Sequence, residues 1–304
     1  IARTIKGKGV EHMEDNPQWH GKAPKPELVP IIEQELESQF MIAPSIIAGD
    51  MSNLEKEVKR CEDGRADYIH LDIMDGQFVP NKTFDHTKIK ELRPLTLIPF
   101  DTHLMINEPI KHVHEYMDAG SDIVTVHAEV CDESSFGEIC DVLQSNQIGV
   151  GLAVNPDTEL PQWSYKFVPL LDQVIIMSVV PGKSGQKFIE STHEKIQRIS
   201  KDLKQHNFEG YIEADGGVNL ENIGSCFEDG ARAFVGGSAI IGQNDVRLII
   251  KEFRNNILES RRRSLIKKAY ELGGKELVNG WIDLHVVGKK KDSLVQIAKE
   301  LDFQ

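Results

Sequence analysis

The sequence predicts an α/β fold, a closed (β/α)8 barrel of the TIM-barrel class with a short appendage at each end. Helix-like stretches, such as 53–63, 108–119 and 191–205, carry apolar residues three and four positions apart. They alternate with strand-like runs, which indicates βαβ units and a parallel sheet. Eight such apolar, β-branched runs start about 27 residues apart, at 41–47, 68–73, 98–104, 123–127, 149–154, 173–178, 211–214 and 233–236.

An open, doubly wound sheet would give the same alternation, so the polar residues are needed to choose between the two folds. Both folds place active sites at the carboxyl ends of their strands. A barrel brings all eight of those ends round one centre, which favours the barrel. The polar residues at the predicted strand ends are His70, Asp72, His103, His127, Glu129, Ser178 and Asp215.

The chain of 304 residues is about twice the common domain length, and its segments differ in character. Residues 39–253 hold all eight predicted units and form the barrel domain. Residues 1–38 contain four prolines and too few apolar residues to build a core. Residues 254–304 read as a separate appendage, with a helix over 261–272, a break at two glycines and a strand over 281–287.

Composition and charge exclude several classes of protein. With 40% hydrophobic and 27% charged residues, the chain is typical of a globular protein. The net charge is −13, and the barrel segment carries 19 basic against 34 acidic residues. This argues against nucleic acid or an anionic membrane as a partner. Four scattered cysteines and no apolar run of about 18 residues predict a cytoplasmic protein without disulfides or membrane spans.

Two histidines and two aspartates at strand ends predict a divalent-metal site. His70 and Asp72 are two residues apart, so both side chains leave the same face of the second strand. His103 ends the neighbouring strand, and Asp215 ends the seventh. Alone, such a histidine is usually a hydrogen-bonded core or surface residue, and an aspartate before glycine usually forms a turn. Four together at one barrel mouth favour a metal site with room for substrate oxygens.

Glycine-rich loops after the last three strands indicate a phosphate site. They read PGKSGQ over 181–186, DGG over 215–217 and GGS over 236–238. Glycines let backbone N–H groups approach an anion, and barrels often bind phosphate after their late strands. One such loop is more often a plain turn. Three consecutive ones in a strongly acidic segment are better support for a phosphate site, because an anion there needs local donors.

Residues 40–242 resemble the ribulose-phosphate 3-epimerases. The ordered motifs are MIAPSIIAGD, HLDIMDGQFVPN, DTHLMI, VHAE, MSVVPGKSGQKF, EADGGV and GGSAI. The resemblance implies a barrel enzyme that interconverts D-ribulose 5-phosphate and D-xylulose 5-phosphate with one divalent ion (Zn, Fe, Mn or Co). It implies that Asp72 and Asp215 are the acid/base pair and that His70, Asp72, His103 and Asp215 hold the metal. The substrate-binding residues that it implies are Ser45, His103, Gly182, Lys183, Ser184, Gly185, Gly216, Gly217, Gly237 and Ser238.

The chemistry of epimerisation fits those roles. Inverting carbon 3 requires removal of a proton next to a carbonyl and return of one to the opposite face, which suits two carboxylates on opposite sides. A metal would stabilise the negative enediolate. The sequence departs from the family at Ala48-Gly49 and in the phosphate loop, which reads GKSG over 182–185 where the family usually has Gly-Phe-Gly-Gly. These departures leave open an allulose-6-phosphate 3-epimerase, or a non-catalytic barrel within a fusion.

Residues 1–28 resemble the end of the thiamine-diphosphate domain of transketolase, through KGKGV and NPQWHGKAP. The resemblance suggests a fragment of a transketolase–epimerase fusion, incomplete, so that no thiamine diphosphate is expected and the histidine at position 20 has no transketolase chemistry here. Residues 254–304 stay an unassigned appendage. We expect a phosphorylated ketose as substrate, and the sequence leaves open a homo-oligomer and a link to transketolase.

Overall fold

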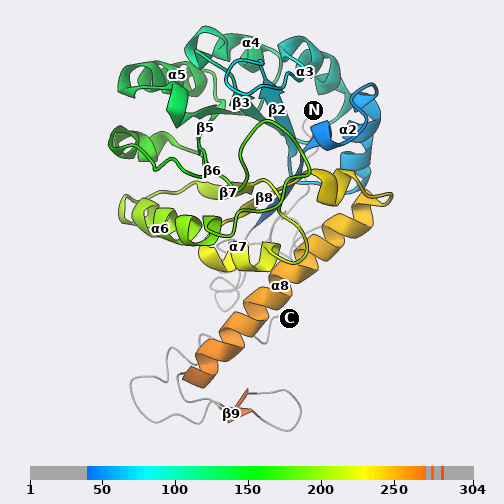
Figure 1. Cartoon of the computed structure of the whole chain (residues 1–304), viewed down its shortest axis with the longest axis vertical. Coiled ribbons are helices and arrows are strands. Elements are labelled where there is room, and N and C mark those ends of the chain that lie inside the picture. Colours follow the sequence, from blue (N-terminus) through cyan, green and yellow to red (C-terminus); the bar gives the residue numbers. More distant parts are fainter. Residues whose placement is uncertain (1–39, 272–274, 277–281, 284–304) are drawn as a thin grey trace, which may run out of the picture.

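Eight parallel strands form the centre of the molecule (Figure 1). The computed structural model describes residues 40–271, 275–276 and 282–283. Strand order is β1-β8-β7-β6-β5-β4-β3-β2, and a parallel bridge between Ser45 and His70 brings β2 back beside β1. The sheet is therefore nearly closed, and the predicted barrel is confirmed. The strands are β1 Met41–Pro44, β2 Ile69–Met74, β3 Phe100–Met105, β4 Ile123–His127, β5 Gly149–Val154, β6 Gln173–Met177, β7 Tyr211–Asp215 and β8 Ala233–Gly236.

Helices surround the strands, as Figure 1 shows, and most follow the predicted alternation. The stretch 108–119, predicted as one helix, divides into a 3-10 turn over Pro109–Lys111 and then α4. The division arises because the backbone of Glu108 is in the left-handed conformation and Pro109 starts a new turn. After β5 the covering element is a 3-10 helix, Gln162–Leu170, with Pro169 inside it. The α-helices are α2 Leu54–Asp63, α3 His86–Leu92, α4 Val113–Asp118, α5 Glu133–Ser145, α6 Thr192–Gln205, α7 Ile223–Asp229 and α8 Val246–Glu271.

Strand register determines which side chains meet inside the barrel. Asp72 on β2 lies opposite His103 on β3, and Asp215 on β7 lies opposite Met177 on β6. Because side chains alternate along a strand, His70 shares the inward face with Asp72. Outward-facing residues form the large apolar core against the helices. The barrel interior is instead rich in polar groups with no exposed surface, namely His70, Asp101, His103, Thr125, Gln173 and Glu213.

A glycine makes room for one of these interior groups. Gly151 on β5 lies between Thr125 and Gln173 in register. A Cβ at this position would lie 1.9 Å from Thr125 Oγ1 and 3.0 Å from Gln173 Cγ. A larger residue would therefore clash with the Thr125 side chain and crowd that of Gln173.

α8 passes through residue 253, where the sequence predicts the end of the barrel domain, without a break. Phe253 and Ile257 on this helix are buried, so the helix still packs on the barrel beyond that point. Figure 1 shows its far end extending past the barrel. The predicted tail 1–38 and most of the predicted appendage lie outside the described residues. Among the described helices, none combines the length and the apolar character that a membrane crossing needs.

Candidate active site

The four predicted metal ligands meet at the carboxyl end of the barrel. Their candidate ligand atoms all lie within 4.8 Å of one another, and all four residues are buried. His70 Nε2 is 3.3 Å from Asp72 Oδ1 and 3.6 Å from Asp215 Oδ2, and His103 Nδ1 is 3.4 Å from each of the same two oxygens. Ligands at the corners of a tetrahedron round zinc stand ~3.3 Å apart, from zinc–nitrogen distances of about 2.0–2.1 Å. The cluster therefore has the dimensions of a metal site.

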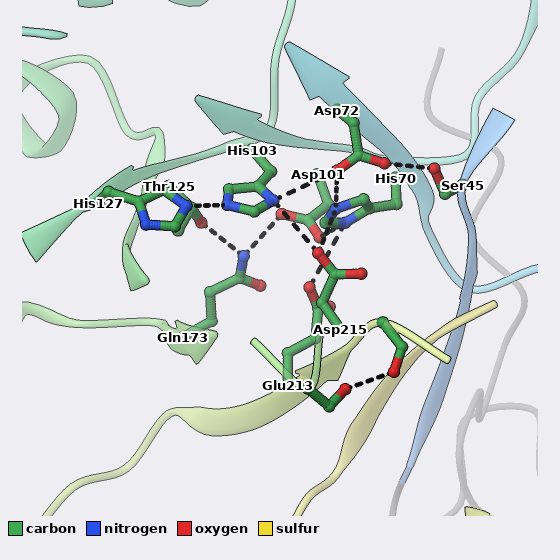
Figure 2. A network of polar contacts seen from close by, with 12 residues as sticks. Ser45, His70, Asp72, Asp101, His103, Thr125, His127, Gln173, Glu213 and Asp215 are labelled. Carbon is green, nitrogen blue, oxygen red and sulfur yellow. Dashed lines mark hydrogen bonds and ion pairs between the residues drawn. The ribbon is translucent and has the colours of Figure 1, made fainter. Parts of the chain in front are cut away.

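Hydrogen bonding in the cluster also fits a cation. His70 Nδ1 is 2.7 Å from Asp101 Oδ2, so the ring N–H donates to this carboxylate and the lone pair of Nε2 faces inward (Figure 2). His70 Nε2 and His103 Nδ1 are both buried without a hydrogen-bond partner. They approach carboxylate oxygens without hydrogen-bond geometry. Two nitrogens and two oxygens pointing at one place are the donor set that a divalent ion takes.

The charges of the cluster favour a positive centre. Burial would raise the pKa of Asp72, but His70 and His103 hold it well below its usual range. Burial would lower the pKa of His70, but Asp72 and Asp101 raise it well above its ordinary value. The pKa of His103 is likewise raised against burial by Asp215 and Asp72. The two carboxylates thus attract positive charge, which protons on the imidazoles or a divalent ion can supply.

Beneath the cluster lies a polar layer that the sequence analysis did not identify. Gln173 Nε2 donates to Asp101 Oδ1 at 2.7 Å and to Thr125 Oγ1 at 2.6 Å, as Figure 2 shows. Glu213 Oε1 is 3.4 Å from His70 Nδ1, and neither of its oxygens has a hydrogen-bond partner. Burial first and Asp101 second raise the pKa of Glu213 well above its ordinary value. Burial beside Asp101 therefore favours the uncharged form of the Glu213 carboxyl.

Spacing in the strands would have revealed part of this layer. Asp101 lies two residues before His103, and Glu213 lies two residues before Asp215. Each pair repeats the spacing of His70 and Asp72, so each puts a second polar group on the same inward face.

His103 contacts a second histidine on its far side. Its Nε2 is 2.8 Å from His127 Nε2, and the ring centroids are 4.9 Å apart with 20° between the ring planes. His127 Nδ1 in turn lies 3.0 Å from Glu129 Oε2. Burial lowers the pKa of His127 to about 4, against the opposing influence of Glu129. His127 and Glu129 are among the strand-end residues noted in the sequence, but the contact of His127 with His103 emerges only from the fold.

A cavity opens above the cluster, and Asp72 and Asp215 lie at its floor. Ser45 Oγ donates to Asp72 Oδ2 at 2.5 Å, so this carboxylate faces the cavity with one oxygen and the cluster with the other. His103 was expected to touch substrate, yet it is fully buried and lies outside the residues that line the cavity. All the other predicted substrate-binding residues line it: Ser45, Gly182, Lys183, Ser184, Gly185, Gly216, Gly217, Gly237 and Ser238.

The rim of the cavity is built mainly from backbone. Gly182, Gly185, Gly216 and Gly217 all have positive φ, the region that favours glycine. Asn81 Nδ2 donates to the Gly182 carbonyl at 2.5 Å, which ties the loop after β6 to the loop after β2. No sequence pattern pointed to Asn81 as part of the site. Lys183 extends from the exposed part of this rim.

Three buried methionines, Met74, Met105 and Met177, line the cavity beside the carboxylates. They contribute a polarizable, apolar wall next to the two acids. The cavity thus combines a floor with two carboxylates, an apolar wall and a rim of glycine-rich loops.

Comparisons with known proteins agree on one family. Residues 41–241 match the model of the ribulose-phosphate 3 epimerase family. The ribulose-phosphate 3-epimerase of Bacillus subtilis is 39% identical over 216 residues, covering 71% of this chain and 98% of that protein. The chloroplastic ribulose-5-phosphate-3-epimerase of Arabidopsis thaliana is 38% identical over 220 residues, which are 72% of this chain and 78% of that protein.

Solved structures of other barrel proteins share the fold at low sequence identity. A 3-keto-L-gulonate-6-phosphate decarboxylase from Vibrio cholerae superposes with a TM-score of 0.53 at 13% identity, over 72% of this chain and 97% of that one. A 3-hexulose-6-phosphate synthase from Salmonella typhimurium gives 0.53 at 16% identity, over 72% of this chain and 99% of that one. These likenesses support the barrel architecture alone.

Proposed function

The chain belongs to the ribulose-phosphate 3-epimerase family and is an epimerase. On that premise we propose that it inverts carbon 3 of D-ribulose 5-phosphate to give D-xylulose 5-phosphate, with Asp72 and Asp215 as the acid/base pair. A divalent ion would be held by His70, Asp72, His103 and Asp215. The observation that carries the proposal is the placement of two carboxylates at the floor of one cavity. They come from β2 and β7, which are separated in the barrel by β8 and β1.

Each carboxylate can exchange a proton with one face of the substrate. One aspartate takes the proton from carbon 3, which leaves an enediolate, and the other returns a proton to the opposite face. The number of protons on the pair is unchanged after turnover, and the two roles reverse in the reverse reaction. Ser45 donates to Asp72 Oδ2, so the hydroxyl holds this carboxylate in place beside the cavity. The buried wall of Met74, Met105 and Met177 limits access of water to the intermediate.

A divalent ion at the cluster would polarise the substrate carbonyl and stabilise negative charge on its oxygens. His70 and His103 would supply the neutral ligands, since their unpartnered nitrogens face the centre. Asp72 and Asp215 would each contribute one oxygen. With one oxygen of Asp72 facing His70 and His103 and the other facing Ser45, the same carboxylate can serve both as ligand and as proton carrier.

The rim would hold the phosphate. Gly216, Gly217 and Gly237 border the cavity, where their backbone N–H groups can donate to an anion, and Ser184 and Ser238 can add hydroxyl donors. Lys183 contributes a positive charge in a strongly acidic barrel. This arrangement selects a phosphorylated ketose. It leaves the choice between ribulose 5-phosphate and allulose 6-phosphate to the length of the cavity between the floor and the rim.

The test is turnover of ribulose 5-phosphate by the full chain loaded with a divalent ion. Asp72→Asn and Asp215→Asn should each lower kcat by about 10²–10⁴-fold, the usual contribution of a general acid or base. Asp85→Asn is the matched control, because Asp85 is the N-cap of α3 and asparagine caps equally well. Full activity in either test variant, or none in the wild type, would contradict the assignment. Comparison of kcat/KM for ribulose 5-phosphate and allulose 6-phosphate identifies the preferred sugar.

Deuterium exchange separates the two acids. In D2O, a variant that keeps the aspartate on the side of the substrate's C3–H should exchange that hydrogen without inverting the carbon. The same aspartate then removes the proton as a carboxylate and returns a deuteron to the same face. Asp72→Asn should do this for one epimer and Asp215→Asn for the other. Exchange with the same epimer in both variants would assign both steps to one residue.

The transketolase link and the assembly state stay predictions. The segment that resembles transketolase lies outside the described residues, and the family match begins at residue 41. Assay of the chain for transketolase activity with added thiamine diphosphate is expected to give none.

A further inference from the structure

The two histidines of the cluster present different ring nitrogens to its centre. His70 uses Nε2, and His103 uses Nδ1. For His70 the cause is Asp101, a carboxylate that holds the proton on the other nitrogen. The outer neighbour of His103 is not a carboxylate but a second imidazole, which can donate or accept. The tautomers of His103 and His127 must therefore be set by a further group that contacts His127.

Glu129 is the group that sets these tautomers. Its Oε2 lies 3.0 Å from His127 Nδ1, and a carboxylate can only accept, so His127 carries its proton on Nδ1. Nε2 of His127 then accepts. Since it lies 2.8 Å from His103 Nε2, that nitrogen must be the donor. The lone pair of His103 is thereby left on Nδ1, 3.4 Å from Asp72 Oδ1 and 3.4 Å from Asp215 Oδ2.

We propose that Glu129, acting through His127, is a positioning residue that fixes His103 in the tautomer able to bind a divalent ion. The inference rests on the proposed function in so far as the cluster holds an ion. The Glu129–His127 pair is held rigidly. Glu129 Oε1 accepts from the backbone N–H of Asn155 at 2.7 Å, and the Phe78 ring packs on His127 with centroids 4.6 Å apart. His127 is fully buried, whereas 19% of the Glu129 side chain is exposed, so Glu129 meets His127 from the solvent side.

The substitution Glu129→Gln should reverse this chain of hydrogen bonds. The N–H of Asn155 can donate only to the new amide oxygen, so the NH2 group turns toward His127 Nδ1. His127 then carries its proton on Nε2, and His103 must accept with its Nε2 and carry its own proton on Nδ1, facing the cluster. To bind a metal ion, His103 would then have to lose the proton from Nδ1. We therefore expect the affinity for Zn2+, measured by chelator competition, to fall about 10–100-fold, as when other outer partners of metal-binding histidines are lost.

Glu133→Gln is the matched control. Glu133 lies four residues further along, and its carboxylate pairs with Lys166 on the surface, away from the cluster. Its loss should leave Zn2+ affinity unchanged. A second pair of variants tests the role of His127. His127→Gln can accept from His103 and donate to Glu129, whereas His127→Leu can do neither, so the glutamine variant should bind Zn2+ more tightly than the leucine variant.

Nitrogen NMR of histidine-labelled protein gives a readout that needs neither activity nor metal. In the metal-free wild type at alkaline pH, where His103 is neutral, Nε2 of His103 should show the chemical shift of a protonated nitrogen and Nδ1 that of an unprotonated one. In Glu129→Gln the two assignments should be reversed. Unchanged His103 shifts together with unchanged Zn2+ affinity in Glu129→Gln would overturn the proposal, as would a proton on Nδ1 in the wild type. If the wild type binds no ion, the metal part of the proposed function fails, while the NMR comparison still decides the role of Glu129.

Discussion

The floor and the rim of the cavity are built in opposite ways. At the floor, His70, Asp72, His103 and Asp215 project from paired strands, and outer partners hold both histidines. The rim consists of loops with positive φ at its glycines, and its lysine is exposed. Chemistry on one carbon needs side chains fixed within a fraction of an ångström, whereas a phosphate needs many N–H donors that close on it. We therefore expect changes at the floor to alter stability, metal binding and kcat, and changes at the rim to alter KM.

The largest expected effect concerns the floor at acid pH. Burial lowers the pKa of His127 to about 4, whereas an unfolded histidine titrates near 6.5. Between these values the unfolded chain binds a proton that the folded chain does not, so the free energy of unfolding is fully retained above pH 6.5 and falls as the pH drops toward 4. The loss attributable to His127 is up to about 3 kcal/mol, from about 1.4 kcal/mol for each pKa unit.

Urea unfolding of the metal-free wild type and of His127→Gln between pH 7 and pH 4 measures this loss. Glutamine does not titrate. The difference in unfolding free energy between the wild type and His127→Gln should therefore shrink by up to about 3 kcal/mol as the pH falls from 7 to 4. Lys183→Gln at the rim is the comparison variant, and its difference from wild type should stay constant. An unchanging difference for His127→Gln would show that His127 has the same pKa in the folded and in the unfolded chain.

A smaller effect is expected when one rim glycine is replaced. A Cβ on Gly217 would lie 2.4 Å from the backbone nitrogen of Phe188 and 2.8 Å from its Cα, in a residue with φ of +66°. Gly217→Ala should therefore displace the loop and remove donors from the phosphate, with a loss of about a hundredfold in kcat/KM, about 2.7 kcal/mol. The loss should appear mainly as a higher KM for the sugar phosphate, with Zn2+ affinity unchanged.

Gly185→Ala is the control for this substitution. Gly185 also has positive φ, at +75°, but a Cβ there would meet nothing within 4 Å. Its effect should be limited to backbone strain of about 1 kcal/mol, or roughly fivefold in kcat/KM. Equal losses in the two variants would mean that loop strain, rather than the contact with Phe188, controls the rim.

The same contrast explains what the sequence could predict. The floor ligands follow from a two-residue spacing on strands whose ends must converge, so His70, Asp72, His103 and Asp215 could be placed together before the fold was known. Gln173 gave no such signal, because it begins an apolar run and its partners Asp101 and Thr125 lie on other strands. Asn81 supports the Gly182 carbonyl from 101 residues away, which no local pattern encodes. Contacts between elements depend on register and loop packing, and these appear only in the folded chain.

The smallest expected effect is that of the rim charge. Lys183 is exposed, so its attraction to a phosphate is screened by water and salt and is worth about 0.2–1 kcal/mol. Lys183→Ala should raise KM by up to about fivefold in about 0.01 M salt, leave kcat unchanged, and match the wild type in about 1 M salt, where the screening length is ~3 Å. Lys183→Arg should keep the low-salt KM. A larger increase in KM that persists in salt would place the ammonium directly on the phosphate, and the acidic barrel would then hold its substrate through a side chain as well as through backbone N–H groups.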